Sequence, residues 1–180
     1  MIASLVEGDV GIKIHELKEE LAKNVGVTRA LKNLPHITFH PPFEVRSGNL
    51  ARLTKRLEEI AARQKAFSIQ LSGFDHFEDR VWFVDIEPSE KLLGVKHDVM
   101  RGASSLVSVR LDPEKERNPH FHVTLAFQEG DPTHPEKILS FLGTKQFEQE
   151  FLVNHLALLQ WTGDGWIVDR MFTFSTPTPS

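Results

Sequence analysis

The chain has 180 residues, no cysteine and a formal net charge of −4 at pH 7. This length suits one domain with a sizeable core, and the negative charge argues against a protein that coats duplex DNA. The absence of cysteine excludes disulfides, thiolate metal sites and a cysteine nucleophile. No apolar run approaches the roughly 18 residues of a membrane span, and the first residues do not resemble a secretory signal. We therefore expect a cytoplasmic protein that acts as a monomer.

The first half of the chain alternates patterns typical of strands and helices. Short apolar runs bounded by proline or polar residues indicate strands, and apolar residues three or four apart indicate helices with one buried face. Asp9 is predicted to cap the first helix. The predicted elements are a strand over 2–6, a helix over 9–24, a strand over 36–40, a helix over 49–64, strands over 67–71 and 81–86, and a turn over 74–79.

The second half repeats this alternation. Its predicted elements are a helix over 89–106, a polar projecting loop over 112–119, a strand over 120–127, a helix over 135–142, strands near 147–159 and 166–174, and a tail over 176–180. The order strand, helix, strand, helix, strands thus occurs twice, roughly before and after residue 90. A duplicated α+β architecture explains this order.

The tripeptide His-x-Thr occurs on two predicted strands, as His36-x-Thr38 and His122-x-Thr124. Alternate side chains of a strand share a face, so each motif has its histidine and threonine on a polar face and apolar neighbours on the other. The imidazole and the hydroxyl lie roughly 6–7 Å apart along the strand, a span comparable to a bound phosphate. Two such strands facing each other would place imidazoles on opposite sides of one phosphate.

This arrangement suits in-line displacement at phosphorus, which needs one group to deprotonate the nucleophile and another to protonate the leaving oxygen. Histidine titrates near neutrality and can do either. Threonine hydroxyls can donate hydrogen bonds to the non-bridging oxygens. We therefore predict that His36 and His122 are catalytic and that Thr38 and Thr124 bind the substrate phosphate.

The residues 35–39, Pro-His-Ile-Thr-Phe, and 122–126, His-Val-Thr-Leu-Ala, resemble the two signature strands of the 2H phosphoesterases. This superfamily includes 2′-5′ RNA ligase-like proteins and cyclic nucleotide phosphodiesterases. The resemblance covers nearly the whole chain and implies a bilobal α+β fold with pseudo-twofold symmetry, antiparallel sheets lining a central cleft and helices outside. It further implies a single domain over 1–180 whose lobes, approximately 1–90 and 91–175, exchange terminal strands.

The resemblance also implies catalysis without metal or another cofactor, in which His36 and His122 exchange the roles of general base and general acid. The implied substrates are a 2′,3′-cyclic phosphate or a 2′-5′ phosphodiester of RNA ends or small nucleotides. In many bacterial RNA ligase-like members the second motif continues Leu-Ala-Arg, whereas this chain has Phe127 in place of the arginine. The candidates to replace that arginine are Arg46, Arg110 and Arg117.

Further substrate contacts are predicted from residue type and strand position. Base-stacking candidates are aromatic residues near the motifs, since bases stack on aromatic rings; they are Phe43, Phe127 and Trp82. His40 and His120 share the polar faces of the motif strands, which makes them candidates for the rim of the site.

Two other functions remain open at this stage. In a metalloenzyme, His120 and His122 would supply two ligands on one strand face, with His36 or His40 as a third. In a binding module without catalysis, the same residues would hold a nucleotide or RNA. Metal analysis distinguishes the first alternative, and turnover of cyclic phosphates distinguishes the second.

Overall fold

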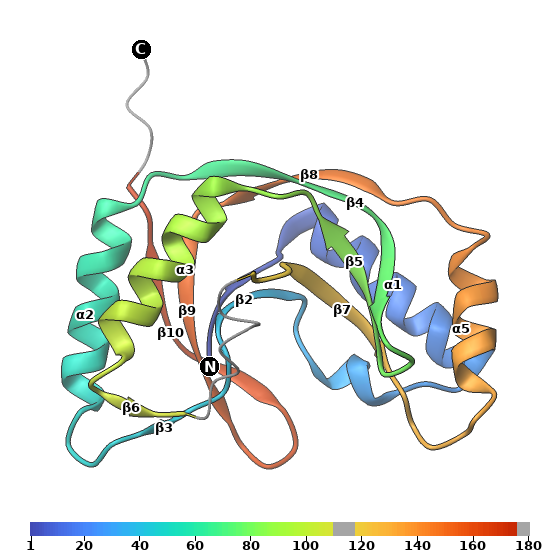
Figure 1. Ribbon diagram of the computed structural model, residues 1–180, viewed down its shortest axis with the longest axis horizontal. Helices are drawn as coiled ribbons and strands as arrows, with labels where there is room; N and C mark the ends of the chain where they lie inside the picture. The colour runs from blue at the N-terminus through green and yellow to red at the C-terminus, as the bar shows by residue number, and fades with distance from the viewer. Residues whose placement is uncertain (110–117, 176–180) are drawn as a thin grey trace.

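The computed structural model describes residues 1–109 and 118–175. The predicted tail over 176–180, most of the predicted polar loop, and Arg110 and Arg117 lie outside these ranges. The described chain folds into helices packed around antiparallel sheets (Figure 1). The predicted α+β class is therefore confirmed.

The first sheet combines strands from the two ends of the chain. Its order is β10-β9-β1-β2, and all its pairs are antiparallel. Its strands are β1 (Ile2–Leu5), β2 (His36–His40), β9 (His155–Trp161) and β10 (Trp166–Thr173). Because β1 pairs with both β2 and β9, the strand that carries the first motif lies at the edge of this sheet.

The second sheet has the order β7-β5-β4-β8 and is also antiparallel. Its strands are β4 (Phe67–Phe77), β5 (Val81–Ile86), β7 (His122–Phe127) and β8 (Glu148–Val153). The strand with the second motif, β7, again lies at an edge. A two-stranded ribbon of β3 (Glu44–Val45) and β6 (Val107–Ser108) stands apart from both sheets.

Within residues 1–109 and 118–175, four α-helices cover the outer faces of the sheets, and a short 3-10 helix, η1, precedes β2. Helices α2 and α3 pack together against the first sheet, whereas α1 and α5 pack together beside the second, as the left and right sides of Figure 1 show. The helices are α1 (Gly8–Val25), η1 (Arg29–Lys32), α2 (Leu50–Arg63), α3 (Glu90–Ala103) and α5 (His134–Leu142).

The order strand, helix, motif strand, helix recurs as β1-α1-β2-α2 and β5-α3-β7-α5. The two units are interleaved, because α1 from the first unit packs against β7, and α3 from the second packs against β2. Each motif strand is thus supported by a helix of the other unit. The core is correspondingly continuous, since one cluster of buried apolar side chains includes residues of both sheets and of all four α-helices.

The structure differs from the predicted elements in a few places. Asp9 lies inside the first turn of α1 and does not cap it, because the cap position belongs to Glu7. The predicted turn over 74–79 is mostly strand, since β4 continues to Phe77 past a register shift between Leu71 and Phe74. The short elements η1, β3 and β6 were not predicted, because two to four residues give no readable periodicity.

Among the described helices, none is long and apolar enough to cross a membrane.

A test of the packing between α1 and β1 uses Gly11, whose added β-carbon would overlap the carbonyl oxygen of Val6. That backbone is held in place, because the Val6 amide donates to the Pro35 carbonyl at 2.8 Å. We expect Gly11→Ala to lower the free energy of unfolding by about 1–3 kcal/mol. Gly94→Ala in α3, where a β-carbon meets nothing within 4 Å, should raise it by about 0.5–1 kcal/mol. Urea denaturation measures the free energy of unfolding of both variants. A Gly11→Ala variant as stable as the wild type would contradict this packing.

Candidate active site

The two His-x-Thr strands lie against each other at the junction of the two sheets. β2 and β7 are the edge strands of their sheets and are in contact, although they do not pair. On the core side the rings of Phe39 and Phe121 meet at 6.3 Å between centroids. The structure therefore brings the two motifs, which are far apart in the sequence, to one place.

Burial alternates across each His-x-Thr tripeptide as the sequence predicts. Ile37 and Val123, between the histidine and the threonine of each motif, are 0% exposed. The four motif side chains, by contrast, are all partly exposed; they are His36, Thr38, His122 and Thr124. Each strand thus anchors its apolar face in the core and leaves the histidine and threonine accessible.

The two motif histidines are held by the same backbone contact. Nδ1 of His36 lies 2.7 Å from the carbonyl oxygen of Leu34, and Nδ1 of His122 lies 2.8 Å from that of His120. Since a carbonyl oxygen only accepts, each Nδ1 carries a proton and donates it. In the neutral imidazole this leaves Nε2 as a lone-pair acceptor. Both rings are therefore fixed in the tautomer whose Nε2 can take up a proton.

The surroundings of His36 favour its neutral form. Burial lowers the pKa of His36 to about 4; the Leu34 carbonyl opposes this shift, and the nearby positive charges of Lys18 and of protonated His122 add to it. Lys18 is itself 2% exposed and donates from Nζ to the Asn33 carbonyl at 2.9 Å. Burial lowers the pKa of Lys18 to about 8. His36 is consequently uncharged at neutral pH.

His122 stands in a different environment. Burial lowers its pKa, and its neighbours include the rings of Phe77 and Phe83, at 5.0 and 4.8 Å between centroids. The carboxylate of Asp85, whose residue is the register partner of His122 across the β5–β7 pair, raises the pKa and so offsets part of this effect. The positive charge of protonated His120 lowers the pKa of His122 further, so His122 has one cation and one carboxylate nearby, whereas the charges near His36 are all positive.

His120 is bound to the same carboxylate. Its Nε2 lies 2.7 Å from Oδ1 of Asp85, and both side chains are partly exposed. The His120 carbonyl in turn accepts from Nδ1 of His122. His120 and Asp85 thus form a hydrogen-bonded pair beside His122.

Two of the further predicted contacts do not fit the structure. His40 is 1% exposed, with Nδ1 at 2.8 Å from the Pro41 carbonyl and its ring against Phe43 at 4.8 Å. Trp82 is 0% exposed and, on the interior strand β5, its ring packs beside that of His76, 6.3 Å away between centroids. Both side chains are buried away from a bound substrate, so the predictions for them are wrong.

The remaining predicted residues lie at or near the surface. Phe43 and Phe127 line a common groove of about 830 Å³. Arg46, one candidate to replace the missing arginine, hydrogen-bonds to the Ser105 carbonyl and to the Ser108 hydroxyl. Arg29, which was not predicted, places its guanidinium 5.1 Å from the centre of the Phe127 ring.

Sequence reasoning missed the residues that set the environment of the histidines, above all Lys18, Phe77 and Asp85. No spacing in the sequence relates them to the motifs. Asp85 and Phe83 could have been found only from the pairing of β5 with β7, which places them on the face of His122 and Thr124.

No three His, Asp or Glu side chains within residues 1–109 and 118–175 are grouped so that they could hold a metal ion. In particular, the two histidines proposed as a ligand pair, His120 and His122, have ring centroids 6.4 Å apart. The described residues therefore do not form the metal centre of the alternative hypothesis.

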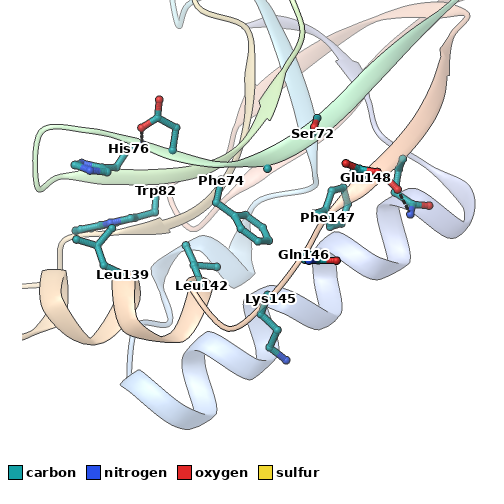
Figure 2. A pocket seen from close by; sticks show the side chains of 14 residues that line it. Ser72, Phe74, His76, Trp82, Leu139, Leu142, Lys145, Gln146, Phe147 and Glu148 are labelled. Atoms are coloured by element: carbon teal, nitrogen blue, oxygen red, sulfur yellow. Dashed lines mark hydrogen bonds between the residues drawn. The ribbon is translucent and has the colours of Figure 1, made fainter.

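A second hollow of about 740 Å³ lies on the face of the second sheet opposite to His122 and Thr124. It lies between β4 and the segment from α5 to β8 (Figure 2). Phe74, Leu142 and Phe147 supply its apolar wall, and Lys145 and Glu148 lie at its margin. None of the four motif residues lines it. It is separate from the candidate active site.

Comparison with solved structures supports the same fold. A protein of Thermus thermophilus superposes with a TM-score of 0.67 at 18% identity, covering 96% of both chains. Escherichia coli LigT, in its complex with 3′-AMP, superposes with a TM-score of 0.65 at 16% identity, covering 97% of this chain and 96% of LigT. These similarities place the chain among the LigT-like α+β folds.

The family follows from the sequence itself. Residues 9–165 match the model of the 2′-5′ RNA ligase superfamily. A Bacillus licheniformis protein named "putative phosphoesterase" is 26% identical over 141 residues, which cover 77% of this chain and 79% of that protein. A Bacillus cytotoxicus protein of the same name is 27% identical over 141 residues, covering 77% of each. The chain belongs to the 2′-5′ RNA ligase superfamily and is a 2H phosphoesterase, which confirms the resemblance seen in the motifs.

The low pKa of His36 predicts how stability depends on pH. An unfolded histidine binds a proton near pH 6.5, whereas folded His36 does so near pH 4, so the unfolded state holds more protons between these values. We expect the free energy of unfolding to fall as pH drops from 6.5 to 4, with His36 contributing roughly 2 kcal/mol. Urea denaturation of His36→Gln should show a shallower fall, with the remainder due to His122 and His155, whose pKa values burial also lowers. An equally steep fall in the variant would contradict a buried, neutral His36.

Proposed function

We propose that this chain is a metal-independent phosphoesterase that hydrolyses a 2′,3′-cyclic phosphate or a 2′-5′ phosphodiester of RNA ends or small nucleotides. The observation that carries the proposal is the matched pair of imidazoles on adjacent edge strands. Each donates Nδ1 to the carbonyl two residues earlier and keeps Nε2 for proton transfer. The structures of LigT in complexes with 3′-AMP and with phosphate are consistent with such a substrate.

The two histidines would have different roles in proton transfer. His36, neutral at neutral pH, accepts a proton from the attacking water through Nε2. The water oxygen forms a bond to phosphorus while the bond to one ribose oxygen breaks, and protonated His122 gives its proton to that leaving oxygen. The product is a phosphomonoester, and the two histidines return to their initial protonation states through exchange with solvent.

The assignment of base and acid rests on the neighbouring charges. The charges near His36, Lys18 foremost, all disfavour a proton there, whereas at His122 protonated His120 disfavours a proton and Asp85 favours one. For a 2′-5′ phosphodiester, the reverse reaction would join the two ends and release water, and the same groups would exchange roles. Thr38 and Thr124 would donate hydrogen bonds to the non-bridging oxygens, since both hydroxyls lie on the partly exposed face of their strands.

We propose that the chain acts as a monomer in the cytoplasm, where RNA ends and small nucleotides occur. The net charge of −4 disfavours a duplex DNA partner. A binding module without catalysis is the weaker candidate, because the side chains that proton transfer needs are intact at both motifs.

Alanine variants test the catalytic pair. His36→Ala and His122→Ala should each lower kcat on a 2′,3′-cyclic nucleotide by about 10²- to 10⁴-fold, the usual contribution of a general acid or base. His97→Ala, which removes an exposed histidine of α3, should leave kcat unchanged. Hydrolysis in EDTA should proceed at the untreated rate. Full activity in either motif variant, or loss of activity with EDTA, would contradict the proposal.

The pH profile tests the assignment of acid and base. Because kcat/KM reports the free enzyme, it should rise as His36 loses its proton near pH 4 and fall as His122 loses its own below pH 6.5. The maximum should therefore lie on the acid side of 6.5.

Asp85→Asn removes the charge that favours protonated His122, so the falling limb should move to lower pH while the rising limb stays in place. The profile of wild type and variant, measured from pH 4 to 9, provides the readout. Activity that increases through pH 7–9, or a limb unaffected by Asp85→Asn, would refute the assignment.

A further inference from the structure

The groove of about 830 Å³ next to the motif strands has an aromatic and basic lining that the proposed reaction leaves unused. Its walls come from η1, the loop after β2, the end of β7 and the hairpin between β9 and β10. The aromatic rings are those of Phe43, Phe127, Trp161 and Trp166, and the cations are Arg29 and Lys32.

The two tryptophans stand on the same side of the first sheet as the first motif. Thr38 pairs with Ala3, and Ala3 pairs with Ala157, so these three residues share a face. Trp161 lies four residues along β9 from Ala157 and therefore on that face too, and Trp166 is its register partner. The hairpin thus presents both indole rings toward the side from which Thr38 would meet a phosphate.

The distance between the tryptophans and the first motif suits an RNA longer than one nucleotide. Four residues along β9 and two strand spacings across the sheet put Trp161 roughly 15 Å from Thr38. That distance exceeds the length of a single nucleotide whose phosphate lies at the motifs. We therefore expect the bases that follow the terminal nucleotide, more than its own base, to meet the tryptophans.

The two indole rings form a tilted pair with one exposed member. Trp161 is 50% exposed, and its ring centroid lies 5.4 Å from that of Trp166 with the planes at 57°. Trp166 packs on a small buried cluster that includes Leu159, so one ring is anchored while the other stands in solvent. At the opposite end Arg29 lies over Phe127, which adds a cation beside an aromatic ring.

We propose that this groove binds the unpaired bases of a single-stranded RNA whose terminal phosphate lies between His36 and His122. The inference rests on the proposed function, and it narrows the substrate from small nucleotides to oligonucleotides. Recognition would come chiefly from stacking, because the groove also contains the carboxylates of Glu44 and Asp164, which offset Arg29 and Lys32.

A comparison of two substrates tests the proposal. We would measure kcat/KM for a 2′,3′-cyclic mononucleotide and for a single-stranded RNA of about six nucleotides that ends in a 2′,3′-cyclic phosphate. Trp161→Ala should lower kcat/KM for the RNA by about 5- to 100-fold, the range expected for the loss of a stacked base, and leave the mononucleotide unchanged. Trp161→Phe, which keeps a stacking ring, should restore most of the RNA activity.

The matched control is Ile167→Ala, because Ile167 lies on the same hairpin, is 49% exposed and stands on the opposite face from Trp166. Ile167→Ala should leave kcat/KM unchanged for both substrates. An equal loss for both substrates in Trp161→Ala, or no loss for the RNA, would overturn the groove proposal.

A binding measurement distinguishes failure of this inference from failure of the proposed function. In a His122→Ala background, fluorescence anisotropy of a labelled single-stranded RNA should show binding that Trp161→Ala weakens by the same factor. If the wild-type protein hydrolyses neither substrate, the proposed function fails. The binding measurement alone then shows whether the groove holds RNA. With two groove cations, a plot of the logarithm of the binding constant against the logarithm of the salt concentration should have a slope of about −1.4. A slope several times steeper would overturn recognition by stacking.

Discussion

Two sheet edges that meet without pairing provide the framework on which the site depends. An edge strand bonds to a neighbour on one side only, and both β2 and β7 occupy such positions. Their apolar faces share one core, which fixes the strands, while the polar faces stay accessible. A paired junction would merge the two sheets into one, whereas the unpaired junction keeps the two His-x-Thr strands on the edges of separate sheets.

Within this framework the two motifs are equal in geometry and unequal in electrostatics. Nδ1 of each histidine is held by a carbonyl of its own chain segment, so the tautomer depends on the local backbone alone. The difference arises from distant residues: a buried lysine of α1 acts on His36, and a carboxylate of β5 acts on His122. A duplicated fold can therefore give its two motif histidines different electrostatic surroundings without changing the motif.

The parts of the structure that could be predicted are those encoded by local patterns. The alternation of Ile37 and Phe39 with polar residues identified β2 and its faces, and the two matching tripeptides identified the candidate site. His40 could not be placed in this way, because its burial depends on the following loop, where its ring packs against Phe43. Trp82 could not either, since its burial depends on the tertiary packing around β5, an interior strand of its sheet.

The interleaving of the two units bears on how the protein matures. β2 is backed by α3, β7 is backed by α1, and β1 pairs with β9, so that the carbonyl of Met1 accepts from the amide of Leu159. During synthesis the amino-terminal half leaves the ribosome well before these partners exist. It cannot complete either motif strand alone, and pairing across most of the chain is a slow step in folding. A nascent or truncated chain would consequently have the sequence of the site without its chemistry, and activity would appear only when the protein is nearly finished.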